Sequence, residues 1–375
     1  MKILITGGAG FIGSKLVNHL ARSGHDITVI DSLIKQVHGK KQNSYTLNEI
    51  LGKCNFVNED INNFSVLKKL VLETEILVHL ASYTGTAQSM YQKDLYCNTN
   101  VNGTNKIYRI LKNNKNKLKK IILTSSRSVY GEGDYQHNDG TIYTSKLNLL
   151  KNVNNKFDFY CNETKKKLMP IAVKETSSIS PKSYYAETKF EQEKILKKIS
   201  SEFEIPCVVL RLQNVYGEGQ SLINPYTGIF SVFSTRILNN SRVEIYEDGL
   251  QSRDFIYVTD VVILINQVIS NKSDSNFHIF NVGSGKRTKI IDIAKKLYKS
   301  FEKKPNYFVS GKSRVGDIRH NFSDISKIKD KYKFRISIDL DHGIKKYSRW
   351  VLKQKIEQDY YEKSIIELKS KGLYK

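Results

Sequence analysis

The chain has 375 residues, of which 39% are hydrophobic and only 5 are proline, and its formal net charge is +23. This composition is typical of a globular protein with one large or two modest cores. No apolar run reaches the roughly 18 to 20 residues that span a bilayer. Glycines interrupt the short apolar start where a signal peptide would continue, so we expect a cytoplasmic protein without a transmembrane segment.

The basic residues are scattered along the chain, with short runs such as residues 114–120. No basic motif interleaved with aromatic residues is present, which favours a solvated lysine-rich surface over nucleic-acid binding. The same surface would suit anionic small molecules or an anionic membrane face. The cysteines, Cys54, Cys97, Cys161 and Cys207, are far apart and form no CxxC pair. This spacing argues against a disulfide framework and against a complete zinc site.

The first predicted element is a strand over residues 2–6, followed by a glycine-rich turn and a helix. The apolar positions after the turn recur at helical spacing: Phe11, Ile12, Leu16, Val17 and Leu20. Gly7, Gly10 and Gly13 lie at the strand-to-helix turn, where glycines allow a tight turn, close approach of a pyrophosphate and close helix packing. The unpaired amides and positive dipole of the helix N-terminus would bind that diphosphate. The unit predicts a dinucleotide site.

A second predicted strand, residues 25–31, ends at Asp31. A carboxylate at this position can bind the adenosine ribose hydroxyls and would repel a 2′-phosphate, which favours NAD over NADP. The alternative is an exposed aspartate at a strand end. Further predicted strands end near Asp60 and Ile61, near Ala81 and Ser82, at Ser126 and near Asn214.

The alternation of strands and helices predicts an α/β fold with a doubly wound parallel sheet of the Rossmann type, whose ligands bind at the carboxyl ends of the strands. We expect an NAD-binding domain over residues 1–205, with an insertion at about 133–178. Residues 206–375 are expected to form mainly a smaller α/β substrate-binding domain, with some segments returning to the first domain.

A tyrosine doublet begins the predicted helix that follows the insertion. Tyr185 and Lys189 are four residues apart and share a helix face, whereas Tyr184 has Thr188 at that spacing. A free tyrosine has a pKa near 10; an ammonium and a nicotinamide ring would both favour its phenolate. We therefore expect Tyr185 to move a proton on a substrate hydroxyl, with Lys189 at the nicotinamide ribose and Ser126 holding the substrate oxygen.

Several strings together resemble the extended short-chain dehydrogenase/reductases, and more narrowly their nucleotide-sugar epimerase/dehydratase group. They are TGGAGFIG, HLAS, NVNGT, SSRSVYG, YAETK, NVYGEGQ and RDFIYVTD, and the resemblance covers about residues 1 to 345. Four further strings, DSLIKQVHG, QSMY, SSRSVYGEG and NPYTGIFSVFSTRIL, are most similar to bacterial dTDP-L-rhamnose 4-epimerases and related sugar 4-epimerases, including the UDP-glucose 4-epimerase type. The resemblance implies a homodimer, with the Tyr185 helix near the contact.

The resemblance also implies roles for individual residues. The expected NAD site comprises Gly7, Gly10, Phe11 and Ile12 at the pyrophosphate, Asp31 at the adenosine ribose, Asp60 and Ile61 at the adenine, Leu80, Ala81 and Ser82 near the riboses, and Asn100 as a structural partner of the active-site strands. The nucleotide half of the substrate is expected at Asn214, Arg253, Arg314 and Asp317. Arginine suits phosphate because its planar fork donates two hydrogen bonds. Arg253 could instead pair with Asp254, and Arg319 competes with Arg314.

The residues after Ser126 discriminate between reactions. Dehydratases of the group carry an Asp-Glu pair there, and the decarboxylating relatives use a Glu at the second position, whereas this chain has Arg127 and Ser128. Neither is a carboxylate acid or base. The expected activity is therefore 4-epimerisation of a nucleotide-diphosphate sugar with tightly held NAD, in bacterial surface-polysaccharide sugar synthesis. The alternatives are a nucleotide 4-keto-sugar reductase and a non-catalytic NAD-sensing or scaffold protein.

The insertion and the C-terminal tail depart from the core pattern. Related 4-epimerases often carry paired cysteines in the insertion that suggest a small metal knuckle, whereas this chain has Cys161, with His137 as the nearest other soft ligand. Two ligands do not make a structural zinc site, so no metal is expected, and the insertion could be a lid or a subunit contact. Residues 342–375 are expected to be helical and to pack on the body; a helix on a membrane surface is the alternative.

Overall fold

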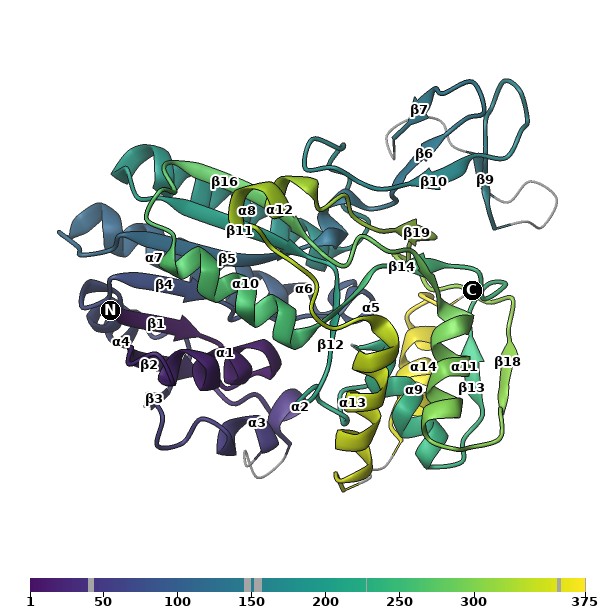
Figure 1. Cartoon of the computed structure of the whole chain (residues 1–375), viewed down its shortest axis with the longest axis horizontal. Helices are drawn as coiled ribbons and strands as arrows, with labels where there is room; N and C mark the ends of the chain where they lie inside the picture. The colour runs from purple at the N-terminus through teal and green to yellow at the C-terminus, as the bar shows by residue number, and fades with distance from the viewer. Residues whose placement is uncertain (40–43, 145–149, 152–156, 227, 356–358, 375) are drawn as a thin grey trace.

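A seven-stranded parallel sheet forms the centre of the protein, in the order β16-β11-β5-β4-β1-β2-β3 (Figure 1). The computed structural model describes residues 1–39, 44–144, 150–151, 157–226, 228–355 and 359–374. The strands are β1 Lys2–Thr6, β2 Asp26–Asp31, β3 Asn55–Asn58, β4 Ile76–His79, β5 Lys120–Ser126, β11 Cys207–Leu212 and β16 Phe277–Val282. All neighbouring pairs are parallel, which confirms the predicted Rossmann sheet.

Helices cover both faces of this sheet, and the strand residues alternate between two cores. Ile3 and Ile5 of β1 pack in one core with α1 Phe11–Ala21 and α10 Val258–Ser270, the two helices that face the viewer in Figure 1. Leu4 packs in the other core with α4 Phe64–Leu72, α7 Gly103–Asn113 and α8 Tyr184–Phe203. A strand buried on both faces needs an almost continuous apolar run, which is why KILIT lacks polar alternation.

Short elements connect these layers at the carboxyl end of the sheet. They are α2 Lys35–His38, α3 Tyr45–Asn48, α5 Thr86–Ser89, α6 Lys93–Tyr96, a π-helix Cys97–Asn102 and a 3₁₀ turn Arg127–Tyr130. The strand ends and these connections leave polar side chains facing the same edge of the sheet.

A second lobe stands beside that edge (Figure 1). Its helices are α9 Ile229–Leu238, α11 Ile290–Ser300, α13 Leu340–Leu352 and α14 Tyr361–Ser370. Its strand pairs are β12 Asn214–Tyr216 with β15 Phe255–Tyr257, and β13 Val243–Ile245 with β18 Tyr307–Val309; β14 Ser252–Arg253 pairs with β17 Thr288–Lys289 and β19 His320–Asn321. The tail is helical, as expected for residues 342–375, in α13 and α14.

The large sheet draws on chain segments beyond the predicted domain boundary at residue 205. β11 and β16 complete one side of it, and α12 Ser326–Tyr332 packs against β16. The strand that ends near Asn214 was among the predicted strands of the sheet, whereas β16 and α12 were not named. The crossovers bring residues 214 and 253 back to the edge where β5 ends.

The insertion forms a small subdomain that projects from the body (Figure 1). Its strands are β6 Asp134–Gln136, β7 Ile142–Tyr143, β8 Leu150–Lys151, β9 Phe159–Tyr160 and β10 Met169–Ile171. A separate apolar cluster of Tyr135, Phe159, Cys161 and Leu168 fills it. The Cys161 thiol lies 3.3 Å from the Tyr143 hydroxyl, and His137 Nε2 lies 2.9 Å from Thr164 Oγ1. Across the described ranges, no group of three or more His, Cys, Asp or Glu side chains could hold a metal ion.

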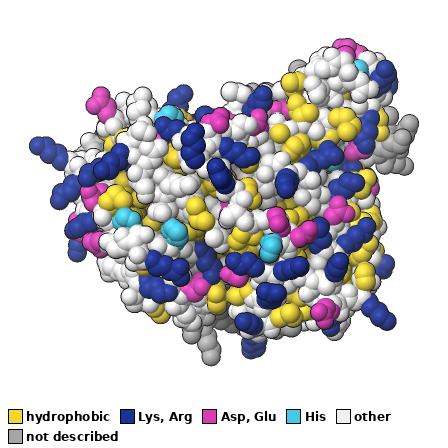
Figure 2. All heavy atoms as spheres, in the orientation of Figure 1, with side chains coloured by type: hydrophobic (Ala, Val, Ile, Leu, Met, Phe, Trp, Pro, Cys, Tyr) yellow, Lys and Arg dark blue, Asp and Glu magenta, His cyan; other side chains and the backbone are white. Residues whose placement is uncertain are grey.

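On the face that Figure 2 shows, the basic side chains are dispersed rather than gathered in one patch. Figure 2 shows Lys and Arg side chains spread over one face of the molecule, with Asp and Glu among them. In the part of the chain that the structure describes, no helix is long and apolar enough to cross a membrane.

Candidate active site

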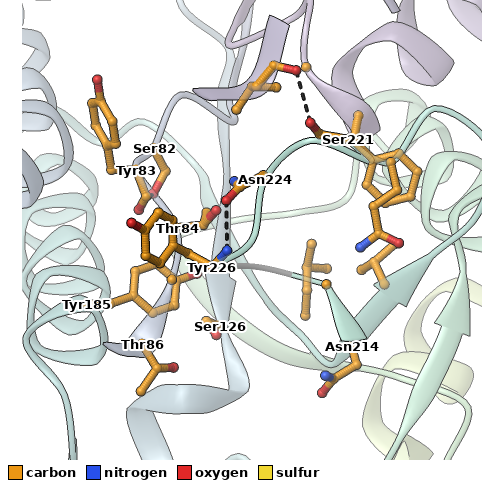
Figure 3. Close-up of a pocket in the computed structure, with 18 of the residues that line it drawn as sticks. Ser82, Tyr83, Thr84, Thr86, Ser126, Tyr185, Asn214, Ser221, Asn224 and Tyr226 are labelled. Carbon is orange, nitrogen blue, oxygen red and sulfur yellow. Dashed lines mark hydrogen bonds between the residues drawn. The ribbon is translucent and has the colours of Figure 1, made fainter. Parts of the chain in front are cut away.

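A cavity of about 550 Å³ lies at the carboxyl ends of the central strands, with walls from both lobes. Every predicted cofactor and substrate residue except Asn100 lines it. Figure 3 shows Tyr185 reaching into this space from α8, with Ser126 near it and Asn214 on another wall. The site is therefore one continuous space that extends from the glycine turn to the arginines of the second lobe.

The glycine turn at the start of α1 leaves no room for side chains. A Cβ on Gly13 would lie 2.6 Å from the Gly7 carbonyl oxygen, and one on Gly7 would lie 2.7 Å from the Ala81 nitrogen. Gly7 also has a φ of +70°, in the region that favours glycine. Gly10 caps α1 without a side-chain hydrogen bond to the first turn. The exposed amides and the helix dipole therefore face the cavity, where an anion such as a pyrophosphate would bind.

Asp31 sits beside this turn at the end of β2. Its Oδ2 accepts from the Ala9 amide at 3.1 Å and its Oδ1 from the Leu33 amide at 3.0 Å. Burial raises the pKa of Asp31, while these amides and His38 oppose the shift. His38 Nε2 lies 3.8 Å from Asp31 Oδ1, a cavity-lining partner that the sequence reasoning missed. The carboxylate is fixed where the second strand of a dinucleotide fold meets a ribose.

The remaining predicted cofactor residues divide into wall and support. Asp60, Ile61, Leu80, Ala81 and Ser82 line the cavity. Asn100 is fully buried and does not line it: its Oδ1 accepts from the Tyr83 amide at 2.9 Å, and its Nδ2 donates to the Tyr83 carbonyl and to Thr188 Oγ1. Asn100 therefore holds the Tyr83 backbone from behind the cavity wall.

Ser126 and Tyr185 meet where β5 ends and α8 begins. Ser183 caps α8 by accepting from the Ala186 amide at 3.3 Å, and the Tyr185 amide donates to Ser89 Oγ at 3.0 Å. The Ser126 side chain lies close enough to Tyr185 to lower the pKa of its hydroxyl. Ser128 Oγ donates to Ser126 Oγ at 2.9 Å, a contact that the sequence reasoning missed. Tyr184 does not line the cavity; it lies under the Lys93 ammonium, which is 5.6 Å from its ring centre.

The pKa of Tyr185 is raised; the expectation of a favoured phenolate counted the Lys189 ammonium and a nicotinamide ring together. Burial is the largest cause, and the Ser126 hydrogen bond and the Arg127 charge act against it. Burial also lowers the pKa of Lys189 to about 7, opposed by the charge of Glu193. Lys189 Nζ donates to the Thr124 carbonyl at 2.9 Å. Lys189 is thus held at the carboxyl end of β5.

The structure distinguishes Arg314 from Arg319, the two arginines that competed for one substrate-binding role in the sequence analysis. Arg314 lines the cavity, pairs with Asp317 at 2.9 Å and has its guanidinium carbon 4.8 Å from the Tyr246 ring centre. Arg319 is fully buried elsewhere and bonds Asp158, Glu247 and Asp248. Arg314 therefore faces the substrate space, and Arg319 joins the insertion to the second lobe.

Arg253 also reaches the cavity, without pairing with Asp254. Its two terminal nitrogens donate to the carbonyls of Ser252, Ile318 and Arg319. Asp254 instead accepts from Ser284, Gly285 and Ser323. The carbonyl contacts fix the guanidinium of Arg253 at the cavity wall, where the charges of Asp317, Glu132 and Glu247 act on it.

Other cavity residues had no sequence-based role. Asn224 and Tyr226 come from the loop before α9, and Asn224 Oδ1 accepts from the Tyr226 amide at 3.0 Å (Figure 3). Tyr361 of α14 also lines the cavity, and its hydroxyl lies 2.6 Å from that of Tyr246. The string NPYTG carried a signal for the first pair; nothing local marked Tyr361, whose place depends on how α14 packs.

Comparison with known proteins agrees with this geometry. The model of the NAD dependent epimerase/dehydratase family matches residues 3–152 and 163–283. A dTDP-L-rhamnose 4-epimerase of Burkholderia thailandensis is 34% identical over 356 residues, 94% of this chain and 95% of the relative. The crystal structure of a Bacillus cereus UDP-glucuronic acid 4-epimerase with UDP-glucuronic acid and NAD superposes with a TM-score of 0.77 at 26% identity, covering 94% of this chain and 99% of that one. The structure of a Thermotoga maritima UDP-glucose 4-epimerase with UDP-glucose superposes with a TM-score of 0.74 at 27% identity, again covering 94% of this chain and 99% of that one.

Proposed function

We propose that this chain, which belongs to the NAD dependent epimerase/dehydratase family, is a nucleotide-sugar 4-epimerase that keeps its NAD bound. One observation carries the proposal: Ser126 and Tyr185 meet at the end of β5, and the two residues that follow Ser126 are not carboxylates. The site can therefore move a proton on a hydroxyl, and neither residue after Ser126 can act as a carboxylic acid or base for removing water.

The residues of the cofactor half fit NAD. Gly7, Gly10 and the amides of α1 would hold the pyrophosphate, Asp31 the adenosine ribose, and Lys189 the nicotinamide ribose. A side chain at Gly13 would fill the space between the turn and the helix. The buried Asp31 carboxylate would repel a 2′-phosphate. When bound, NAD supplies a reversible hydride acceptor.

The proton chemistry belongs to Tyr185 and Ser126. For oxidation at C4, Tyr185 takes the hydroxyl proton while Ser126 holds the same oxygen. For reduction of the 4-keto sugar, the raised pKa of Tyr185 favours return of that proton to the oxygen. Reduction on the opposite face gives the C4 epimer. The oxidation and the reduction together are redox neutral, so an enzyme that retains its cofactor needs no external reductant.

Dehydration at C5 and C6 needs a carboxylic acid and a carboxylate near the sugar. Arg127 and Ser128 occupy the positions that would supply them. Ser128 is engaged with Ser126, as its Oγ donates at 2.9 Å and its amide at 3.2 Å. These contacts support a role for Ser128 in orienting the Ser126 hydroxyl rather than in acid/base chemistry.

The substrate is a nucleoside-diphosphate hexose in this proposal. The Burkholderia relative acts on a dTDP-sugar by its name, and the two solved structures hold UDP-sugars. Both nucleotides therefore belong in the assay panel. The proposal also includes a role in surface-polysaccharide sugar synthesis, a process that uses nucleoside-diphosphate hexoses.

The test incubates purified protein with dTDP- and UDP-sugars, without NADH, and follows the C4 proton by NMR. We expect interconversion of C4 epimers, bound NAD in the purified protein, and a loss of about 10² to 10⁴-fold in rate for Tyr185→Phe. Tyr184→Phe is the matched control and should keep nearly full rate. Stoichiometric consumption of NADH without bound NAD would identify a 4-keto-sugar reductase instead. Full activity of Tyr185→Phe would refute the catalytic assignment altogether.

A further inference from the structure

Arg127 is a cavity residue that the reaction outlined above does not bring into contact with substrate. It opens the 3₁₀ turn Arg127–Tyr130 directly after Ser126, and its side chain lines the same cavity as Ser126 and Tyr185. A large cation at this point needs a physical reason, because burying a charge is costly unless it is paired.

The side chain is anchored at one nitrogen only. Arg127 Nε donates to Asn214 Oδ1 at 2.8 Å. Among the described residues, the side chain of Arg127 makes no other hydrogen bond and no ion pair. Its two terminal nitrogens carry four N–H groups in a fixed plane and can only donate. Asn214 thus orients a fork of donors that open onto the cavity.

The surrounding charges leave Arg127 without a dedicated counterion. Burial lowers its pKa to about 9, and the positive charge of Arg253 adds to this effect; Asp317, Tyr185 and Glu132 act in the opposite direction. Asp317 is already paired with Arg314 at 2.9 Å. Three arginines line this half of the cavity, Arg127, Arg253 and Arg314, with two carboxylates, Asp317 and Glu244. A ligand rich in hydrogen-bond acceptors would therefore complement this part of the cavity.

The position of Arg127 decides which part of a ligand it meets. It follows Ser126 in sequence, and its charge acts on both Tyr185 and Arg253. In the proposed function, Tyr185 marks C4 of the sugar and Arg253 the diphosphate. A cavity residue close to both groups is within reach of the hexose that joins C4 to the diphosphate.

We propose that Arg127 is a substrate-contacting specificity residue, whose terminal nitrogens donate to oxygen acceptors of the hexose itself. This inference rests on the proposed function and goes beyond it by assigning the sugar-recognising cation. Because a guanidinium fork binds paired oxygens best, adjacent hydroxyl oxygens or a carboxylate of the sugar are the acceptors that it fits. The diphosphate is left to Arg253 and Arg314.

The experiment compares binding of nucleotides with and without a sugar to the NAD-containing protein by calorimetry. The probes are UDP and dTDP against UDP-glucose, UDP-glucuronate and dTDP-glucose. For Arg127→Gln we expect the affinity for the best-bound nucleotide sugar to fall by about ten-fold or more, the usual size of a lost charged hydrogen bond. The affinity for the free nucleotide should change less than about two-fold. Arg253→Gln should weaken both classes alike.

The outcomes separate the two levels of the proposal. Equal losses for free nucleotide and nucleotide sugar in Arg127→Gln would place Arg127 at the diphosphate and overturn the inference. No loss in either would make it a structural anchor of Asn214, which also overturns it. Failure of the wild-type protein to bind any of these probes would instead refute the proposed function. Retained NAD reports folding of the variant, and Arg127→Lys, which keeps the charge without the fork, carries the same comparison if Arg127→Gln does not fold.

Discussion

A buried ion pair beneath the catalytic strand gives the sharpest stability test of this fold. Glu193 of α8 accepts from Arg211 of β11 at 2.7 Å and 3.0 Å, and from Ser125 Oγ of β5 at 2.6 Å. The side chains of the ion pair are 2% and 3% exposed. Arg211 also donates to the Tyr130 hydroxyl at 2.9 Å. Removing the carboxylate charge leaves a buried guanidinium without its counterion.

Glu193→Gln should therefore cost about 3 to 5 kcal/mol of folding free energy, the range for breaking one side of a buried pair. At an unfolding entropy of about 2.1 cal/mol/K per residue, a chain of this length loses about 1.3 °C for each kcal/mol. The expected fall in melting temperature is about 4 to 6 °C, measured by differential scanning calorimetry at saturating NAD.

Glu191→Gln is the matched control on the same helix. Glu191 pairs with Lys194 at 2.6 Å, but these side chains are 47% and 53% exposed. An exposed pair contributes about 0 to 1 kcal/mol, so its melting temperature should change by about 1 °C or less. Equal shifts in the two variants would show that burial of the Glu193 pair does not set its energy, and the reasoning would fail.

Three further predictions concern the cofactor turn, the buried lysine and the assembly. Gly13→Ala places a Cβ 2.6 Å from Gly7 and Gly8 backbone atoms, so the purified variant should lack bound NAD by absorbance, and normal NAD content would contradict the close packing. Because burial lowers the pKa of Lys189 to about 7, the unfolded chain binds one more proton than the folded chain between about pH 7 and pH 10. Stability from this group therefore rises with pH in that window, and Lys189→Met should raise the melting temperature of NAD-free protein by several degrees at pH 6 and much less at pH 10; a gain independent of pH would contradict a charged buried lysine. We also expect a homodimer of about twice 43.1 kDa with α8 near the contact, so a monomer mass in light scattering would refute the assembly.

Features that depend on local residue spacing could be predicted from the amino-acid sequence. The strand, glycine turn and helix over residues 2–21 follow from one apolar run and its periodicity, and the structure has β1 and α1 there. The four-residue spacing of Tyr185 and Lys189 separates the two tyrosines, because a helix places them on one face. In the structure Tyr185 and Lys189 line the cavity and Tyr184 does not.

The partners, burial and charge environment of a side chain could not be predicted in this way, because they depend on contacts between segments that are distant in the sequence. Arg314 and Arg319 stand five residues apart, yet Arg319 pairs with carboxylates from the insertion and from the second lobe. Asn100 carries a conspicuous motif but lies behind the wall. The pKa of Tyr185 follows from burial by several elements together. Periodicity fixes which face a residue takes on its own element, whereas the partner of that face, and hence its burial and charge environment, is set by how the chain packs.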